Sequence, residues 1–302
     1  MRVLMKVKIV GPLEKKRWIA AYLFIAPIVI LFVIFRIYPL FYNFVLSFMK
    51  WNVFKSEGTW VGLNNYIKLI HDETFFCALK NTLLYTVIFV PAQITAGLGI
   101  ALLLNAKFPG RTFCRTTFFM PYIVTLIATA AIWRWLYHPV SGLINTVLER
   151  LNLPTCLWLH GIHTALGSVI IYSLWQSIGY SMIIFLAGLQ AIPQRYYEAA
   201  EIDGASKFQS FTFITLPLLT PTLLLVLVMT TILAFGVFDQ IYVMTQGGPI
   251  HATLVLVLYT YKLAFTFLKF SYAATVAVVF FSLTLLVAII ELKLLGKRRM
   301  TY

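Results

Sequence analysis

Four hydrogen-bonding side chains lie together in an apolar stretch without charged residues, residues 163–190. They are Ser173, Gln176, Ser177 and Tyr180, and their spacing places them on one face of a helix. Hydroxyl and amide groups beside a flat aromatic ring suit the binding of a polar solute, and polar residues inside a membrane helix often have a function. The same residue types also join neighbouring helices by hydrogen bonds. On the residues alone, both interpretations stay open.

The connection at residues 191–215 has the pattern of two short helices joined by a sharp turn. Pro193 suits the start of a helix, because its missing N–H would have no partner there. Gly204 accepts the left-handed backbone that ends such a helix, and Ser206 can cap the next one. Glu198 and the two alanines after it offer a charge and small side chains to another protein. This predicts a docking element, with an ordinary amphipathic connector as the alternative.

This connection resembles the EAA loop in the permease subunits of ABC importers. The matching residues are Glu198-Ala199-Ala200, Gly204, Ile214, Leu216 and Pro217, at the family's spacing. Three further segments resemble the carbohydrate-uptake permeases of the maltose and glycerol-phosphate type: Trp60-Val61-Gly62-Leu63-Asn64-Asn65-Tyr66, Asn81-Thr82 and Thr245-Gln246-Gly247-Gly248-Pro249. The last is typical of the larger permease of the pair. The resemblance runs from about residue 20 to the C-terminus, without the maltose protein's two extra N-terminal spans and large outer domain.

The resemblance implies an all-α polytopic membrane protein with the type I ABC-importer permease fold, six transmembrane helices and cytoplasmic EAA coupling helices. Its implied partners are a sister permease, two ATP-binding subunits and an extracytoplasmic solute-binding protein that delivers a sugar. The residues that it assigns to ATPase coupling are Tyr197, Glu198, Ala199, Ala200, Asp203, Gly204, Ala205 and Phe208. The chain has no GxxxxGK[ST] motif for a nucleotide phosphate. We therefore expect no catalytic residue and no bound cofactor here, and ATP and Mg in the partner subunits.

The resemblance also implies a sugar pathway through three spans. Ungapped alignment from the matching motifs places its residues at Tyr122, Leu126, Ser173, Gln176, Ser177, Tyr180, Thr230, Leu233 and Ala234. Leu233 and Ala234 depart from the family's more polar or aromatic residues, so an identical sugar specificity is not implied. The sequence names neither the sugar nor its size.

Composition defines the elements that must position these residues. Of 302 residues, 61% are hydrophobic and 11% charged, and the mean hydropathy is +0.87. Soluble domains average about a quarter charged residues, so most of this chain must lie in lipid. A helix needs about 20 apolar residues to span a membrane. Six apolar runs without charged residues meet this length, at residues 18–35, 81–106, 116–133, 163–190, 208–238 and 270–290.

The distribution of basic residues predicts the orientation. With the N-terminus inside, the inner connections hold roughly twice as many Lys and Arg as the outer ones, which places both termini in the cytoplasm. We expect a multi-pass protein of the bacterial cytoplasmic (inner) membrane. Its predicted parts are a cytoplasmic tail at 1–17, a first transmembrane helix at 18–38, an extracytoplasmic connection at 39–80, a five-helix transport core at 81–295 and a cytoplasmic tail at 296–302. The first apolar run is longer than a cleavable signal segment.

Other functional classes find little support. The net charge of +14 lies in short groups between apolar runs, which is typical of membrane topology, so we expect no nucleic-acid partner. A secondary transporter would need coupling-ion carboxylates within its spans. A membrane enzyme would need clustered His, Asp, Glu or Cys at one depth. A permease for another small polar solute, such as a glycerol phosphate, is the closest alternative.

A few single residues keep open interpretations. Asp239, the single acid of the fifth span and the first residue after its charge-free run, suits either a pore role or solvation at a helix end. His160 and His163 lie three residues apart in an outer connection, and we predict no metal site there. The three cysteines lack a CxxC pattern and are interpreted as isolated thiols.

Overall fold

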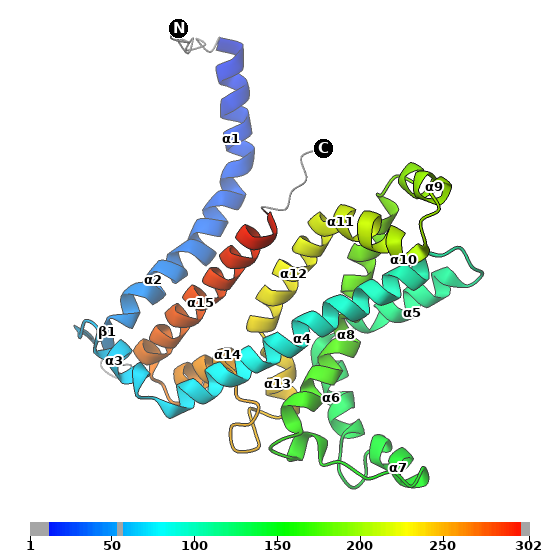
Figure 1. Cartoon of the computed structure of the whole chain (residues 1–302). Helices are drawn as coiled ribbons and strands as arrows, with labels where there is room; N and C mark the ends of the chain where they lie inside the picture. Colours follow the sequence, from blue (N-terminus) through cyan, green and yellow to red (C-terminus); the bar gives the residue numbers. More distant parts are fainter. Residues whose placement is uncertain (1–11, 53–56, 297–302) are drawn as a thin grey trace.

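The computed structural model describes residues 12–52 and 57–296 as a set of long apolar helices (Figure 1). Five helices are long and apolar enough to cross a membrane, and a bent pair makes a sixth if it is counted as one span. This confirms the predicted helical class. Most of the two predicted tails, residues 1–11 and 297–302, lies outside the described residues.

The first span is longer than the sequence predicted. It consists of α1 (Pro12–Phe32), a π-helical turn (Val33–Ile37) and α2 (Tyr38–Ser47). The π turn lies directly before Pro39, whose ring removes one backbone donor from the helix. The helix therefore continues through Tyr38-Pro39 to Ser47, whereas the sequence predicted an outer connection from residue 39 onward. The most apolar 18-residue window of this span has no buried residue.

A small hairpin follows, which the sequence did not predict. β1 (Met49–Asn52) pairs antiparallel with β2 (Glu57–Trp60), and α3 (Asn64–Ile70) packs beside it. The Asn65 Nδ2 donates to the carbonyl oxygens of Ser47 and Met49, both at 2.9 Å. Asn65, which belongs to the motif Gly62-Leu63-Asn64-Asn65-Tyr66, thus joins the hairpin to the end of α2.

The longest helix, α4 (Glu73–Asn105), crosses the whole molecule and packs along α8 (Ala165–Gln190). Its 33 residues span about 50 Å, which exceeds a hydrocarbon core of about 30 Å and requires a tilt. Asp72 caps its first turn, and its Oδ1 accepts from the N–H groups of Thr74 and Phe75. Gly97 allows the close approach of α8, because a Cβ there would lie 2.7 Å from the Ser181 Cβ.

The third predicted span is broken into two helices. α5 (Arg111–Ile123) and α6 (Leu126–Leu136) meet at a bend of 95°. Val124 and Thr125 between them have extended backbone angles. A continuous helix over residues 116–133 was therefore the wrong expectation.

The remaining elements are short except for α12 and α15, and the fifth span is also interrupted. They are α7 (Leu143–Arg150), a 3₁₀ turn (Trp158–His160), α9 (Arg195–Ile202), α10 (Lys207–Ser210), a π turn (Phe211–Thr215), α11 (Leu216–Leu218), α12 (Thr220–Phe235), α13 (Asp239–Met244), α14 (Leu256–Tyr261), a π turn (Lys262–Thr266) and α15 (Phe270–Gly296). α12 packs against both α4 and α15, and α4 packs along α8. α4 and α12 therefore link α15 to α8.

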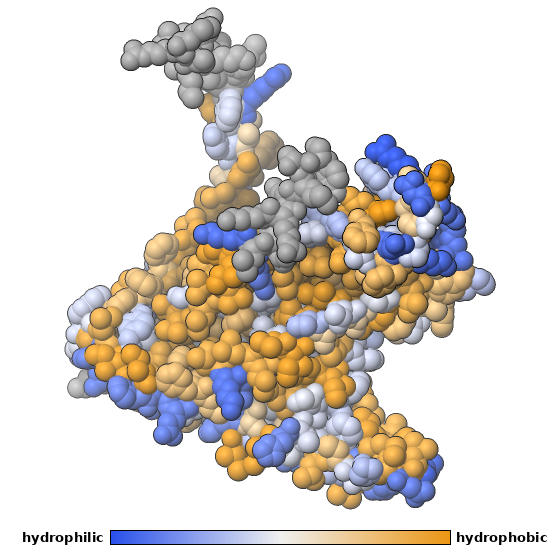
Figure 2. Space-filling view, in the orientation of Figure 1, coloured by the Kyte–Doolittle hydropathy of each residue, from blue (hydrophilic) through white to orange (hydrophobic). Residues whose placement is uncertain are grey.

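The ends of the bundle differ in what they carry. The start of α1, the end of α15 and α9 lie at one end, and the hairpin, α7 and the segment after α13 lie at the other (Figure 1). An apolar band separates the more hydrophilic ends (Figure 2). The start of α1, the end of α15 and the 191–215 connection thus share one side, as the predicted topology requires, while the side that faces the cytoplasm stays a prediction.

Candidate functional site

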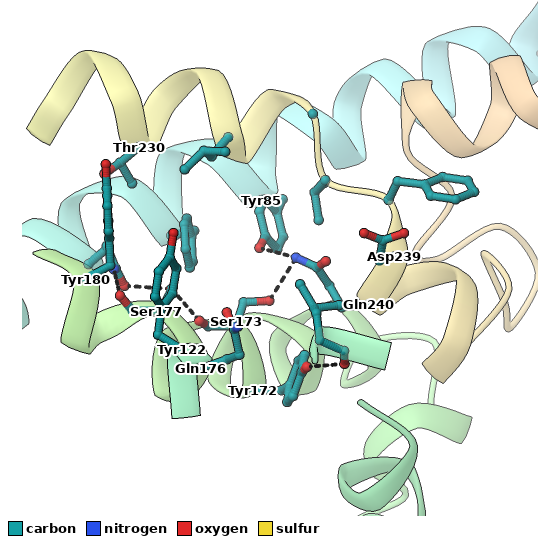
Figure 3. A pocket seen from close by; sticks show the side chains of 17 residues that line it. Tyr85, Tyr122, Tyr172, Ser173, Gln176, Ser177, Tyr180, Thr230, Asp239 and Gln240 are labelled. Atoms are coloured by element: carbon teal, nitrogen blue, oxygen red, sulfur yellow. Dashed lines mark hydrogen bonds between the residues drawn. The ribbon is translucent and has the colours of Figure 1, made fainter. Parts of the chain in front are cut away.

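A cavity of about 280 Å³ lies between α4, α8 and the two broken spans (Figure 3). Its lining combines hydroxyl, amide and aromatic groups with one carboxylate. The lining residues are Tyr85, Phe89, Gln93, Tyr122, Leu126, Tyr172, Ser173, Gln176, Ser177, Tyr180, Thr230, Leu233, Gly236, Val237, Phe238, Asp239 and Gln240. We call it the central cavity.

The polar face of α8 forms one wall of the central cavity. The Gln93 Nε2 on α4 donates to the Ser177 carbonyl at 2.7 Å, and the Ser177 Oγ donates back to the Gln93 Oε1 at 3.2 Å. Gln93 also donates to the Ser181 Oγ at 3.0 Å. Ser177 of this face therefore joins two helices, and Gln176 and Tyr180 also line the cavity, while their contact with a solute stays a prediction.

Two stacked aromatic pairs border the same space. Tyr122 on α5 stacks on Tyr180 on α8, with ring centroids 5.1 Å apart and an interplanar angle of 26°. Tyr85 stacks on Phe89 along α4, with centroids 5.2 Å apart. Flat apolar faces next to hydrogen-bonding groups suit a solute that has both hydroxyls and a C–H surface.

Both breaks in the helices open onto the central cavity. Tyr122 and Leu126 stand on either side of the α5–α6 bend, and Gly236 lies between α12 and α13. The carbonyl of Leu126, at the first turn of α6, accepts from the Tyr172 hydroxyl at 3.0 Å. Irregular backbone within a membrane is tolerated where it is buried in protein or lines a wet cavity. The breaks therefore identify this space as the polar interior of the bundle.

The cavity wall carries a charge where α13 begins. Asp239, the first residue of α13, is the single charged residue of the lining among the residues that the structure describes. Its neighbour Gln240 donates through Nε2 to the Tyr85 hydroxyl at 3.3 Å and to the Ser173 Oγ at 3.5 Å (Figure 3). A carboxylate can accept hydrogen bonds from solute hydroxyls but offers nothing to an anion.

The structure places eight of the nine predicted pathway residues in this lining: Tyr122, Leu126, Ser173, Gln176, Ser177, Tyr180, Thr230 and Leu233. The expectation fails for Ala234, which is 1% exposed and packs in the hydrophobic core. One residue along a helix is a turn of about 100°, which moves this side chain off the cavity face. Contact of the other eight with a solute stays a prediction.

The α4 wall was missed by sequence reasoning. Tyr85, Phe89 and Gln93 follow one another at intervals of four, which places them on one helical face. Gln93 is the one amide in the middle of the apolar run at residues 81–106, between Asn81 and Asn105 near its ends, and this signal was available. Tyr172, four residues before Gln176 and eight before Tyr180, carried the same signal on α8, whereas Gln240 gave no comparable pattern.

The predicted docking element has the expected backbone. α9 ends in a Schellman motif, in which the Ala205 N–H donates to the Ala200 carbonyl and the Gly204 N–H to that of Glu201. Gly204 has a φ of +74°. Ser206 caps α10 in a capping box with Gln209, through bonds of 3.3 and 2.8 Å.

Some side chains of this connection are buried against the permease and others are exposed. Ala200 is buried, and the Tyr197 hydroxyl lies 3.0 Å from the Thr215 Oγ1, which ties α9 to the π turn. Glu198, Ala199 and Phe208 are exposed. Only one of the two adjacent alanines is therefore open to a partner, because neighbouring positions on a helix face different ways.

Comparison with known proteins identifies the family. The model of the family described as binding-protein-dependent transport system inner membrane component matches residues 84–300. The chain belongs to this family. The permease is 36% identical to the trehalose/maltose transport permease MalF of Thermococcus litoralis, over 92% of this chain and 94% of that protein. It is 35% identical to the arabinooligosaccharide transport permease AraP of Bacillus subtilis, over 92% and 88%.

A solved structure shows the same fold. The permease superposes with a TM-score of 0.85 on a chain from a bacterial ABC transporter that imports the acidic polysaccharide alginate, at 24% identity, covering 97% of this chain and 100% of that one. The family match covers most of α4 through α15, and so contains the central cavity and the 191–215 connection.

Proposed function

We propose that this permease forms half of the membrane pathway of an ATP-driven importer for a sugar or oligosaccharide. The supporting observation is the central cavity, whose hydroxyl, amide and aromatic lining suits a carbohydrate. The relatives named for trehalose and maltose and for arabinooligosaccharides, at 36% and 35% identity, support the same solute class.

In this proposal the energy comes from partner subunits. A sister permease completes the pathway, two ATP-binding subunits supply ATP hydrolysis with Mg, and an extracytoplasmic binding protein delivers the sugar. The exposed Glu198 and Phe208 dock the permease on one ATP-binding subunit. Both termini and α9 face the cytoplasm.

The charge of the central cavity argues against the alternative of a glycerol phosphate. Its lining contains Asp239 and no basic side chain. A phosphate group brought into this low-dielectric space would meet a like charge without a counter-charge. A neutral saccharide meets no such penalty.

The test is purification of the tagged permease with its copurifying subunits in lipid nanodiscs. We expect an ATPase subunit to copurify, and ATP hydrolysis to rise when a binding protein loaded with a neutral saccharide is added. The same assay with glycerol phosphate supplies the comparison. Stimulation by the anionic solute alone, or copurification without any ATPase, would refute the proposal.

A further inference from the structure

A second cavity lies between the hairpin, α3 and the start of α15. Figure 1 shows these elements at the end of the molecule opposite α9. It has a volume of about 510 Å³. Three exposed lysines line it, Lys50, Lys68 and Lys269, and Trp51 and Tyr272 add aromatic surface. We call it the basic cavity.

The positive charge of the basic cavity has no carboxylate within its lining, as far as the described residues go. The Asp72 carboxylate contacts Tyr272 of its wall but is already engaged. Its Oδ2 accepts from the hydroxyls of Tyr272 at 2.6 Å and Tyr259 at 2.5 Å. The Lys68 ammonium lies over the Tyr272 ring, 5.2 Å from its centroid. Three lysines in one concave site favour an anion.

A separate apolar groove lies along the seam between α2 and α15. It has a volume of about 310 Å³. Its lining residues are Leu40, Phe41, Asn43, Phe44, Ala277, Val278, Phe281 and Ser282. We call it the seam groove.

The cavity and the groove lie on one stripe of α15. Ser271 lines the basic cavity and Val278 the seam groove, and seven residues bring a helix back to the same face. The Trp51 N–H donates to the Ser271 Oγ at 2.8 Å, and the Thr275 Oγ1 donates to the Ser47 carbonyl at 3.2 Å. These bonds hold the stripe against the end of α2. Six residues, about 9 Å of helix, separate Ser271 from Ala277.

We propose that the basic cavity and the seam groove together bind one anionic phospholipid from the membrane leaflet on this side. The lysines hold the phosphate group, and the seam groove takes an acyl chain. The tryptophan and tyrosine of the cavity wall are the residue types that favour the headgroup level of a bilayer. A lipid joins an anionic head to an apolar chain within this short distance. An acidic protein surface would use the basic cavity alone and leave the seam groove without an occupant.

The test uses the full-length permease, purified in detergent with its copurifying subunits and measured by native mass spectrometry. Phosphatidylglycerol and phosphatidylcholine with identical chains are added in competition. We expect the wild type to retain phosphatidylglycerol preferentially. Replacing Lys68→Gln together with Lys269→Gln should reduce the preference about 25-fold, from about fivefold for each lysine near an anionic headgroup. Lys68→Arg with Lys269→Arg should keep it.

A matched control removes two other lysines, Lys80 on α4 and Lys262 after α14, both outside the basic cavity. Lys80→Gln with Lys262→Gln should leave the preference unchanged. An Ala277→Phe variant, which fills the seam groove, should weaken binding of long-chain phosphatidylglycerol but not of the dihexanoyl form.

Three outcomes would overturn the proposal. The first is equal retention of both lipids by the wild type. The second is the same loss of lipid preference in both glutamine pairs. The third is unchanged lipid retention in the Lys68 and Lys269 pair together with a lost response to the binding protein. The last would show that these lysines face an acidic protein.

Discussion

The ring of Tyr122 stacks on that of Tyr180 across the break in the third span, with centroids 5.1 Å apart. Tyr122 is the last residue but one of α5, which ends at Ile123 before the bend of 95°, whereas Tyr180 lies within an unbroken helix. The pair therefore joins a bent wall of the central cavity to a straight one.

This pair should matter for transport through its ring faces. Tyr180→Ala removes a stacked ring, which is worth about 0.5–1.5 kcal/mol beyond its buried area, along with any contact to a solute. We expect uptake to fall about tenfold while copurification of the ATPase stays normal. Tyr180→Phe keeps the stacking and is the control. Equal uptake in all three proteins would show that the ring only packs.

Gln176 supplies a second test of the cavity. Its side chain is 8% exposed and lines the central cavity. Gln176→Ala removes a buried amide, and a lost hydrogen bond to a buried group costs about 1–3 kcal/mol. We expect uptake to fall by about one order of magnitude, measured with radiolabelled sugar in cells that contain wild-type levels of the complex. Ile171, on the exposed face of α8, gives the control substitution Ile171→Ala.

The docking role of the 191–215 connection can be tested at Gly204. A β-branched residue is strained at a φ of +74°, so Gly204→Val should misdirect α10 and weaken ATPase copurification. Gly62 also has a positive φ, +58°, and neither glycine has a side-chain neighbour within 4 Å of an added Cβ. Gly62→Val is thus a matched control that strains the other end of the molecule. Loss of the ATPase in both variants, or in neither, would contradict the docking role.

Reversal of charge at Glu198 tests the same surface without backbone strain. The side chain is exposed, so Glu198→Lys should leave the permease folded and inserted. Like-charge contact with the partner would cost several kcal/mol and abolish stimulation of ATP hydrolysis by the loaded binding protein. Glu201→Lys, three residues further along α9, compares a second exposed acid. Full stimulation in the Glu198 variant would rule out this contact.

Asp72 should make the stability depend on pH. Burial alone raises the pKa of its carboxyl, but hydrogen bonds from Tyr259, Tyr272 and the N–H groups of Phe75 and Thr74 hold that pKa below the usual value of 3.8. Stabilisation from this group is therefore fully present above pH 3.8 and is lost as the pH falls below it. Thermal unfolding at pH 7 and pH 3 should show a smaller pH-dependent loss for Asp72→Asn. An identical loss in both proteins would assign the acid sensitivity to other groups.

Much of the architecture follows from the apolar runs, because lipid forces long uninterrupted helices. The breaks do not. The bend after Ile123 occurs at Val124 and Thr125, neither of them glycine or proline, so it depends on tertiary contacts such as the bond from Tyr172 to the Leu126 carbonyl. The hairpin after α2 carries no Asn-Gly or Gly-Gly turn between its strands, and its strands depend on Asn65.

The candidate site is likewise predictable from the sequence only in part. Spacing alone places Ser173, Gln176 and Tyr180 on one face, and the cavity lies on that face. The α4 wall and Gln240 come from segments far apart in the sequence, and only packing brings them together. The prediction for Ala234 fails because a sequence alignment transfers the position of a residue but does not show which way its side chain faces around the helix.

The first helix has one further consequence. Its most apolar window has no buried residue, so the rest of this chain does not cover it. We therefore expect insertion of this helix not to depend on folding of the helices that follow. A reporter fused before α1 would record delivery to the membrane even in a variant whose central cavity never forms, whereas a reporter of proper assembly must be placed between α4 and α15.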